Sequence, residues 1–255
     1  MLKLQQVSVR RDGRALLEDV TLTVGRGELL ALVGPNGAGK TTILRAMLGL
    51  AAPTHGAVWL GEASLGSYSA RQRAAHVAWL PQHSSGGEEL PALEVVMAAR
   101  FRFEEPLAAC EQEARAALAR VGAEAVATRA LGSLSGGERQ RVALAALLAQ
   151  SAPILLADEP ANHLDPAQQI DVYRLLGELW RGGKTVVCVT HDVNLLRHLG
   201  EPARVRVAGV AQGRLRFELP LDSSELPSAL GELFGLHMHA LVLNGQRVLL
   251  PERSA

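Results

Sequence analysis

The residues of this chain best suited to chemistry form a glycine-rich loop, GPNGAGKT, at residues 34–41. Glycines let backbone N–H groups curl around phosphate oxygens without clashes from a Cβ atom, and a following helix presents its N-terminus to the same anion. Lys40 adds a cation for the β- and γ-phosphates, and the hydroxyl of Thr41 is a natural Mg²⁺ ligand. A chance glycine turn is the alternative, but a buried run before the loop and a helix after it favour a phosphate-binding loop.

A pair of adjacent carboxylates, Asp158 and Glu159, follows the apolar run Ile154–Ala157. Ligands of open parallel sheets gather at the carboxyl ends of the strands, so we expect both acids to face the phosphate loop. Asp158 is suited to the Mg²⁺ shell, and Glu159 is placed to polarise an attacking water. An isolated Asp-Glu pair is more often a solvated turn. The preceding strand and the upstream phosphate loop favour a functional pair here.

A third candidate is the segment LSGGERQ at residues 134–140. Ser135 is expected to cap a helix, and Glu138 stands where a capping box needs it. Gly136 and Gly137 at the helix start also expose N–H groups that suit an anion. Because one nucleotide needs only one phosphate loop, a second such helix start indicates a site completed by another copy of the chain.

These residues must be positioned by the strands and helices of an α/β unit. Leu29–Val33 indicates a buried strand and Thr41–Leu50 a helix, which is how a parallel α/β unit opens. Alternating apolar residues on both sides of Asp12-Gly13 predict an antiparallel hairpin. The other expected elements are helices at Leu107–Val121, Gly136–Gln150, Gln168–Arg181 and Ser223–Phe234, strands at Ile154–Ala157, Thr185–Val189, Arg204–Val210 and Leu215–Leu219, and a hairpin at Asn244-Gly245.

Composition limits the class of protein. Lys+Arg and Asp+Glu are both 26 and aromatic residues make up 4%, so we expect no nucleic-acid partner, because such binders usually have a basic excess and stacking aromatics. No stretch approaches the ~18 apolar residues of a membrane helix, and the N-terminus is not that of a signal peptide. We therefore expect a soluble, cytosolic chain. Cys110 and Cys188 lack the paired spacing of a zinc site and are expected to be buried or unremarkable thiols.

Taken together, these segments resemble the nucleotide-binding domain of ABC transporters. Residues 34–41 match the Walker A loop, residues 135–140 the signature, and residues 154–158 Walker B, with Glu159 as the catalytic carboxylate. Gln82 matches the Q-loop, residues 162–165 resemble the D-loop, and His191 matches the switch histidine. The resemblance covers roughly residues 1–215, and six motifs in order are far more specific than one.

The fold that this resemblance implies is α/β, a P-loop NTPase with a RecA-like parallel sheet core. It adds an N-terminal antiparallel β subdomain and an inserted α-helical subdomain. The expected boundaries within the single domain 1–255 are 1–88 and 151–215 for the core with its antiparallel subdomain, 89–150 for the helical subdomain, and 216–255 for a C-terminal extension.

The resemblance also implies a homodimer that binds ATP with Mg²⁺ between two copies. Gln82 would contact the metal and the attacking water, His191 the γ-phosphate, and Asp165 would cross the interface. Taken alone, they read as a surface glutamine, a histidine at a helix start and an N-cap. The implied ATP contacts are Gly34, Pro35, Asn36, Gly37, Ala38, Gly39, Lys40, Thr41, Thr42 and Arg11; the signature contacts from the other copy are Ser135, Gly136, Gly137 and Gln140; the metal ligands are Thr41, Gln82 and Asp158; the catalytic residues are Glu159, His191 and Gln82.

One position departs from the family pattern. The family usually places an aromatic residue in the N-terminal hairpin to stack on adenine, and that position falls at Arg11. Arg11 either stacks on the base through its guanidinium plane or is a solvated hairpin charge, and the sequence leaves both readings open. Base specificity is therefore not predicted.

Within the family, residues 61–74, the LPQ at residues 80–82 and Leu93–Val96 are similar to the ATPases of importers for iron–siderophore, haem and cobalamin. The resemblance implies a separate integral membrane permease, an indirect periplasmic or extracellular binding protein, and a peripheral place on the cytoplasmic face of the membrane. The polar segment His83–Glu89 is expected near the cleft that receives the coupling helix of the permease.

The sequence is less consistent with two other functions and with a metal site. A soluble ABC ATPase of an assembly or nucleic-acid complex is disfavoured by the single motif set without a basic extension. A non-hydrolysing scaffold is disfavoured because Glu159 and His191 are both present. His237 and His239 fit one face of a strand, but without a third ligand a structural role is favoured over metal binding.

Overall fold

The computed structural model describes residues 1–82, 86–162, 164–243 and 245–253. The chain divides into two compact units, and each is described by itself. The first unit comprises residues 1–67 and 173–255, and the second comprises residues 68–172. The predicted division into core, helical subdomain and C-terminal extension stays a prediction.

The first unit opens with an antiparallel sheet, which confirms the predicted hairpin at Asp12-Gly13. Apolar side chains alternate along its first strand, and Leu2, Leu4, Val7 and Val9 are all buried. This is the period of a strand with one face against the core. The strands, in sheet order, are β2 (Arg14–Val24), β1 (Leu2–Arg11), β4 (His55–Leu60) and β5 (Ala63–Ser64).

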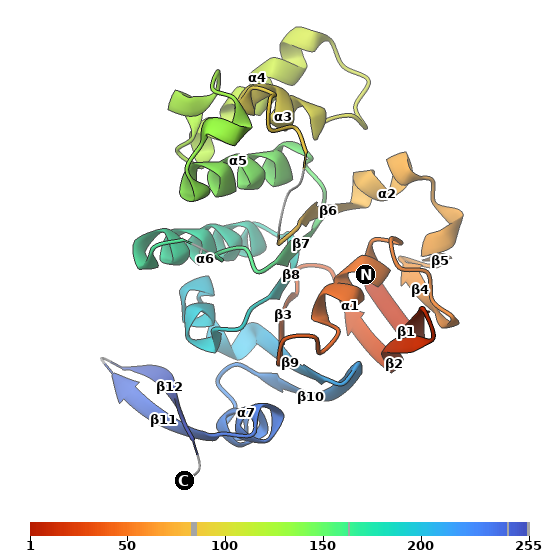
Figure 1. Ribbon diagram of the computed structural model, residues 1–255, viewed down its shortest axis with the longest axis vertical. Coiled ribbons are helices and arrows are strands. Elements are labelled where there is room, and N and C mark those ends of the chain that lie inside the picture. The colour runs from red at the N-terminus through yellow and green to blue at the C-terminus, as the bar shows by residue number, and fades with distance from the viewer. Residues whose placement is uncertain (83–85, 163, 244, 254–255) are drawn as a thin grey trace. The chain divides into compact units, whose positions relative to one another are not determined.

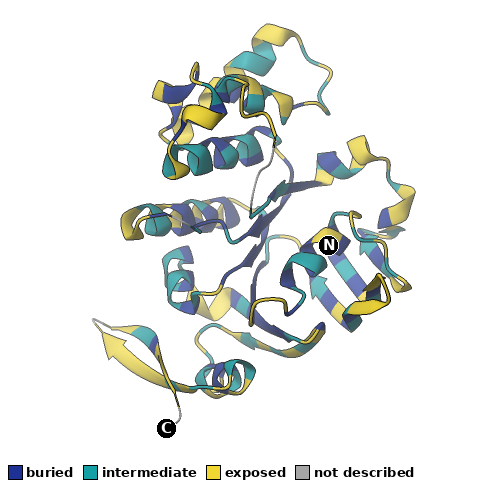
Figure 2. Ribbon diagram, in the orientation of Figure 1, coloured by how far each residue is buried: buried dark blue, intermediate teal, exposed yellow. Residues whose placement is uncertain are grey.

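A second sheet of the first unit contains the predicted parallel strands. Strand β3 (Leu29–Val33) pairs in parallel with β8 (Thr185–Val189) on one side and with β9 (Val205–Ala211) on the other. Strand β10 (Arg214–Pro220) pairs antiparallel with β9. Every residue of β3 and β8 is buried, as the dark blue strands of Figure 2 show. Continuous apolar runs of this kind are typical of parallel strands covered on both faces.

The helices of the first unit differ from the predicted ones at their ends. Helix α1 (Lys40–Met47) follows β3, and α7 (Leu226–Phe234) packs against β9 and β10 (Figure 1). The predicted start of α7 at Ser223 is wrong, because the Ser223 hydroxyl closes a turn with the N–H of Glu225 and the helix begins only after it. Short 3₁₀ helices are Leu65–Ser67, Val193–Leu199 and Pro202–Arg204.

The C-terminal hairpin is a separate two-stranded sheet of β11 (His237–Leu243) and β12 (Gln246–Glu252). This confirms the predicted hairpin, although Asn244 of its turn lies outside the described residues. His239 Nε2 lies 2.6 Å from Glu252 Oε2 across the two strands. Most of β11 is exposed (yellow in Figure 2), so this hairpin contributes little to the core.

The second unit contains one parallel strand pair and the predicted helical segment. Strands β6 (Val77–Leu80) and β7 (Ile154–Asp158) pair in parallel. The helices are α2 (Ala70–His76), α3 (Ala92–Ala98), α4 (Leu107–Arg120), α5 (Gly136–Ala149) and the first part of α6 (Pro166–Arg181), with 3₁₀ turns at Glu124–Val126 and Leu131–Ser133. Elements α2, β4, β5 and β6 were not predicted from the sequence.

Small side chains form the core between α3, α4 and α5 in the second unit. Ala92, Ala114 and Ala145 are fully buried there beside larger residues such as Leu118 and Val142. Alanine at these contacts lets the helices approach closely. The predicted helical segment is thus a packed cluster with a core of its own.

Both cysteines are free thiols within the described residues. Cys188 is fully buried in β8, and burial raises the pKa of its thiol to about 12. Cys110 is half-buried on α4, where its Sγ donates to the carbonyl of Met97 at 3.7 Å. Burial also raises the pKa of the Cys110 thiol, and such protonated thiols are poor nucleophiles, as expected of buried or unremarkable cysteines.

Candidate functional site

The glycine-rich loop joins β3 to α1 in the first unit. Gly34 has a φ of 148°, and a Cβ atom there would lie 2.0 Å from the carbonyl oxygen of Val210. Gly39 has a φ of 107°, and a Cβ there would lie 2.9 Å from the Leu17 side chain and 3.0 Å from the carbonyl of Leu16. Larger residues therefore do not fit, and the loop follows this path because both positions are glycine.

Lys40 lies inside this loop and is only 6% exposed. Its Nζ donates to the carbonyl oxygen of Gly34 at 2.7 Å and to that of Pro35 at 2.9 Å. The ammonium thus ties the end of β3 to the start of α1, and it places a positive charge where the sequence predicts phosphate.

The N-terminus of α1 suits an anion. Its N-cap is Gly39, and no side chain in the described part of the protein caps it. The positive end of the helix dipole is therefore left for a ligand, and the adjoining residues 35–37 are exposed. Thr41 and Thr42 follow on the first turn and are half-buried. This donor set fits phosphate oxygens, and the Thr41 hydroxyl is an oxygen ligand of the kind Mg²⁺ prefers.

His191 is the second residue after β8, the parallel neighbour of β3. The N–H of Thr190 donates to the carbonyl of Leu32 at 3.1 Å, so the two strands end at the same edge of the sheet. Thr190 and Asp192 hold the turn through hydrogen bonds of 3.1 Å between the threonine hydroxyl and the Asp192 backbone. His191 is exposed on this turn. The strand before it, β8, is the neighbour of β3, which leads into the phosphate loop.

Arg11 lies at the end of β1, beside the hairpin turn. Its side chain is 74% exposed, and its Nε is 3.8 Å from Asp12 Oδ2. At that exposure the ion pair holds the guanidinium weakly, so the side chain is available to move. This geometry suits both of the roles that the sequence left open.

The second unit places Gln82 beside Glu159. Their strands are paired in register at Leu80 and Ala157, and each of the two residues lies two positions beyond its paired residue. Gln82 Nε2 donates to Glu159 Oε2 at 2.7 Å. The Q-loop amide and the candidate catalytic carboxylate are therefore in direct contact. Asp158, the last residue of β7, is 1% exposed, so its carboxylate is shielded from bulk solvent.

Asn162 is a third member of this cluster, although its sequence position predicted no separate role for it. Its Nδ2 donates to the same oxygen of Glu159 at 2.9 Å, and its backbone N–H donates to the Glu159 carbonyl at 3.1 Å. Glu159 has a φ of 51°, which turns the chain sharply at the end of β7. The sequence signal that could have indicated this contact is an amide residue, Asn162, three positions after the carboxylate of Glu159.

The predicted capping box of α5 is confirmed. Ser135 is the N-cap, its hydroxyl accepts from the N–H of Glu138 at 3.3 Å, and its own N–H donates to Glu138 Oε2 at 2.8 Å. Hydrogen bonds from Ser135 lower the pKa of the Glu138 carboxyl, with a further contribution from Arg129. Gly136 is exposed and Gly137 is half-buried at the start of this helix.

Further contacts tie this helix to the loop after β7. Gln140 Nε2 donates to the carbonyl of Pro160, the residue after Glu159. The side chain of Gln168 packs over Gly137, because a Cβ added there would lie 2.5 Å from Gln168 Oε1. Asp165 Oδ1 accepts from the N–H of Gln168 at 2.9 Å, which confirms the predicted N-cap of α6. His163, between these residues, lies outside the described residues, as do residues 83–85 of the segment expected to meet the permease.

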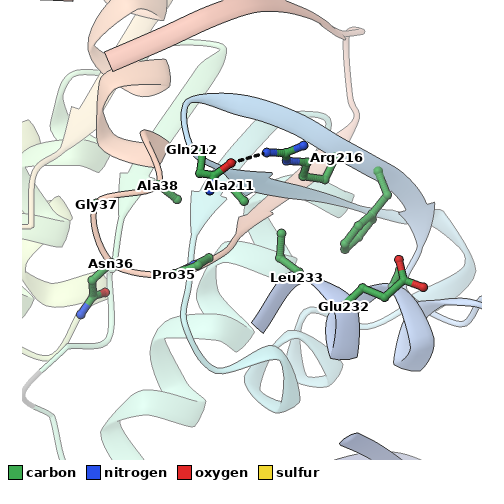
Figure 3. A pocket seen from close by; sticks show the side chains of 11 residues that line it. Pro35, Asn36, Gly37, Ala38, Ala211, Gln212, Arg216, Glu232 and Leu233 are labelled. Atoms are coloured by element: carbon green, nitrogen blue, oxygen red, sulfur yellow. Dashed lines mark hydrogen bonds between the residues drawn. The ribbon is translucent and has the colours of Figure 1, made fainter. Parts of the chain in front are cut away.

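A cavity of about 650 Å³ borders residues 35–38 in the first unit. Figure 3 shows it between the loop, the β9–β10 hairpin and α7, with Glu232 and Leu233 on the helix side. Gln212 Oε1 accepts from Arg216 Nη2 at 2.9 Å, the dashed line of Figure 3. The C-terminal extension therefore lines a space beside the phosphate loop, which the sequence did not indicate.

The family profile of ABC transporters matches residues 17–162 of the chain. The chain belongs to the ABC transporter family. It is an ABC-type ATPase, and its fold is the P-loop NTPase fold that the sequence predicted.

Three known proteins illustrate this membership. The hemin import ATP-binding protein HmuV of Pseudomonas aeruginosa is 40% identical over 200 residues, which are 76% of this chain and 78% of that relative. The zinc import ATP-binding protein ZnuC of the same species is 41% identical over 197 residues, 77% of this chain and 67% of the relative. The dimeric bacterial ABC transporter cassette MJ0796 has a TM-score of 0.79 at 31% identity, covering 88% of this chain and 100% of that one.

This ATPase contains, in the described ranges, no helix that is both long and apolar enough to cross a lipid bilayer. The MJ0796 cassette has also been solved in a post-hydrolysis state bound to ADP and Pi.

Proposed function

We propose that this chain is the ATP-hydrolysing subunit of an importer, that it works as a homodimer, and that it drives a separate integral membrane permease. The cargo we propose is a metal chelate of the iron–siderophore, haem or cobalamin type. The names of the relatives support import, although one of them is a hemin importer and the other a zinc importer. A substrate-binding protein on the other side of the membrane would deliver the cargo to the permease.

The observation that carries this proposal is the hydrogen bond of 2.7 Å between Gln82 and Glu159. These residues are 77 positions apart, and the fold brings an amide that can sense ligand into contact with a carboxylate that can accept a proton. A general base must lie within hydrogen-bond reach of the proton that it takes up. Glu159 is therefore assigned to orient and deprotonate the attacking water, with Gln82 and His191 as its assistants.

The loop at residues 34–42 is assigned to the phosphates of ATP. Its backbone N–H groups and the buried Lys40 ammonium would stabilise charge on the transferred group, which is the main task of the protein in phosphoryl transfer. Arg11 is assigned to the base. Mg²⁺ would be held by Thr41, Asp158 and Gln82, and when bound it would supply neutralisation of the phosphate charge.

The second copy is assigned the contacts that one chain lacks. Ser135, Gly136, Gly137 and Gln140 would offer the start of α5 to the phosphates bound by the other copy, and Asp165 would cross the same interface. A dimeric cassette among the similar structures supports this arrangement. The chain would sit peripherally on the cytoplasmic face of the membrane, held there by its permease.

The test is Glu159→Gln, which keeps the shape of the side chain and removes its basicity. We expect the variant to lose turnover by at least about a hundredfold, because general-base catalysis contributes 10²–10⁴ in rate. It should accumulate an ATP-bound dimer in size-exclusion chromatography. The matched control is Glu178→Gln, an exposed glutamate on α6, which should behave as the parent. Unchanged turnover in Glu159→Gln would remove Glu159 from this role.

A second test addresses the assigned second copy. Ser135→Arg should bind ATP as tightly as the parent but should not hydrolyse it, because a bulky cation would block the start of α5. Full activity of this variant would contradict completion of the site by another copy. Cargo is tested by co-purifying the permease and comparing hemin with Zn²⁺ for stimulation of ATPase activity in proteoliposomes.

A further inference from the structure

Glu159 receives two amide hydrogen bonds on one oxygen. Gln82 Nε2 lies 2.7 Å and Asn162 Nδ2 2.9 Å from Glu159 Oε2. The two donors differ in origin, because Gln82 follows β6 whereas Asn162 belongs to the turn that Glu159 itself begins. A carboxylate oxygen can accept two such bonds at once, and together they fix the rotation of the group.

Asn162 is fixed to Glu159 twice. Besides the side-chain bond, its backbone N–H donates to the Glu159 carbonyl at 3.1 Å, which closes a turn over Pro160 and Ala161. Both of these intervening residues are buried, and the Pro160 carbonyl accepts from Gln140 Nε2. The turn is therefore restrained by its own backbone hydrogen bond and by the bond from Gln140. Both restraints keep the amide of Asn162 close to the Glu159 carboxylate.

The two donors also differ in what else they must do. The proposed function assigns Gln82 to a metal ion and a water, and a contact with either competes with its bond to Glu159. Asn162 has no such second task in that assignment. When Gln82 turns to the ligand, the bond from Asn162 is the one that remains on Oε2.

We propose that Asn162 is a positioning residue for hydrolysis: it holds the Glu159 carboxylate in its productive rotation while Gln82 engages the nucleotide. This inference rests on the proposed function, because it needs Glu159 to act on the attacking water. Asn162 itself touches neither ATP nor water in this scheme. Its effect is transmitted wholly through Glu159.

The experiment compares Asn162→Ala and Asn162→Asp with the parent chain. Hydrogen bonds to charged groups are strong enough that losing one lowers a rate by about tenfold to a hundredfold. We expect kcat to fall by that factor, with KM for ATP changed less than about threefold, since ground-state binding is untouched. The isosteric Asn162→Asp keeps the size of the side chain, removes the donor and sets a second carboxylate against Glu159, so its loss of kcat does not come from a packing defect. It also covers the case in which the alanine variant does not fold.

Two readouts distinguish positioning from a general structural role. In a Glu159→Ala background, Asn162→Ala should cause no further loss of the residual rate, because the group that it holds is gone. With ATP present, Asn162→Ala should accumulate the dimer in size-exclusion chromatography as Glu159→Gln does. A crystal structure of Asn162→Ala should show the Glu159 carboxylate rotated, and this measurement does not depend on turnover.

The matched control is Asn194→Ala, which also loses amide hydrogen bonds. Asn194 Nδ2 donates to the carbonyl of Leu249 at 3.0 Å, and its Oδ1 accepts from the Leu249 N–H at 2.8 Å, outside the hydrolysis machinery. This variant should retain the parental kcat.

Parental kcat in both Asn162 variants, an equal loss in the Glu159→Ala background, or an unmoved carboxylate in the crystal structure would each overturn the positioning role. Failure of the proposed function looks different, because the parent chain itself would then hydrolyse no ATP, or Glu159→Gln would remain active.

Discussion

Helices α1 and α5 both have glycine at or directly after the N-cap and were both predicted to bind phosphate, yet their N-termini are built in different ways. The N-cap of α1 is Gly39, in a left-handed conformation, and no side chain of the described protein caps that helix. The N-cap of α5 is Ser135, which shares two hydrogen bonds with Glu138. The first helix start has no side-chain cap and leaves its N–H groups for a ligand, whereas the second is capped by side chains of its own first turn. A helix that must be presented ready-made to another copy gains from its own cap, whereas one that binds the nucleotide directly gains from leaving its N–H groups available.

The largest effect is expected at the uncapped helix, in Lys40→Ala. The loop holds the Lys40 ammonium through the carbonyls of Gly34 and Pro35, and a charge-assisted hydrogen bond from that ammonium to a phosphate oxygen would be worth about 1.5–3 kcal/mol. ATP affinity should fall by about tenfold to a hundredfold, measured by calorimetric titration. Lys3→Ala, in β1, is the control and should bind as the parent. Unchanged ATP affinity in Lys40→Ala would contradict the assignment of the uncapped start of α1 to phosphate binding.

The two glycines offer the next test, through Gly39→Ala and Gly137→Ala. A methyl group at Gly39 meets a backbone carbonyl at 3.0 Å in a left-handed conformation and should lower the free energy of unfolding by about 1–3 kcal/mol. At Gly137 the methyl group meets only the end of the Gln168 side chain, which can move, so the cost should stay below about 1 kcal/mol. Urea denaturation measures both. Equal losses would show that the two helix starts are equally constrained.

A smaller effect is expected from Ser135→Ala at the capped helix. Loss of a serine N-cap costs about 1 kcal/mol of stability, and here the N–H of Glu138 loses its acceptor. The midpoint of urea unfolding should fall while ATP affinity of the single chain stays the same. Should the stability of Ser135→Ala equal that of the parent, α5 would not depend on its cap.

The smallest effect is a pH dependence at the same cap. Hydrogen bonds from Ser135 lower the pKa of Glu138 in the folded chain below its ordinary value of 4.5. A depressed carboxyl pKa contributes stability that is fully present above the unfolded value and is lost as the pH falls through the folded value. The stability advantage of the parent over Glu138→Gln should therefore be full at neutral pH and shrink below about pH 4.5. An advantage that persists unchanged at pH 3 would exclude this cap as its source.

Much of the local structure around the site could be predicted from the sequence. The Ser135 capping box, the strand β8 and the helix α6 all depend on neighbouring residues, and they formed within a few positions of the predicted ends. The start of α7 was missed by three residues, because Ser223 favours a local turn that competes with the helix.

Contacts between distant segments could not be predicted in this way. The bond between Gln82 and Glu159 depends on the register of β6 against β7, and that register is set by pairing rather than by local propensity. The amide of Asn162 reaches Glu159 because Glu159 adopts a positive φ, which glutamate rarely does. The resemblance to ABC transporters named the motif residues, but it did not indicate these bonds.

Because Lys40 is buried, covalent labelling of its amine can report whether the phosphate loop is closed or open. The chain contains three lysines, Lys3, Lys40 and Lys184. Lys3 and Lys184 are half-buried, whereas the Lys40 amine is engaged by two carbonyl oxygens. An acylating reagent should therefore modify Lys40 last, and the order of acylation, followed by mass spectrometry, would report when the loop opens without any nucleotide in solution.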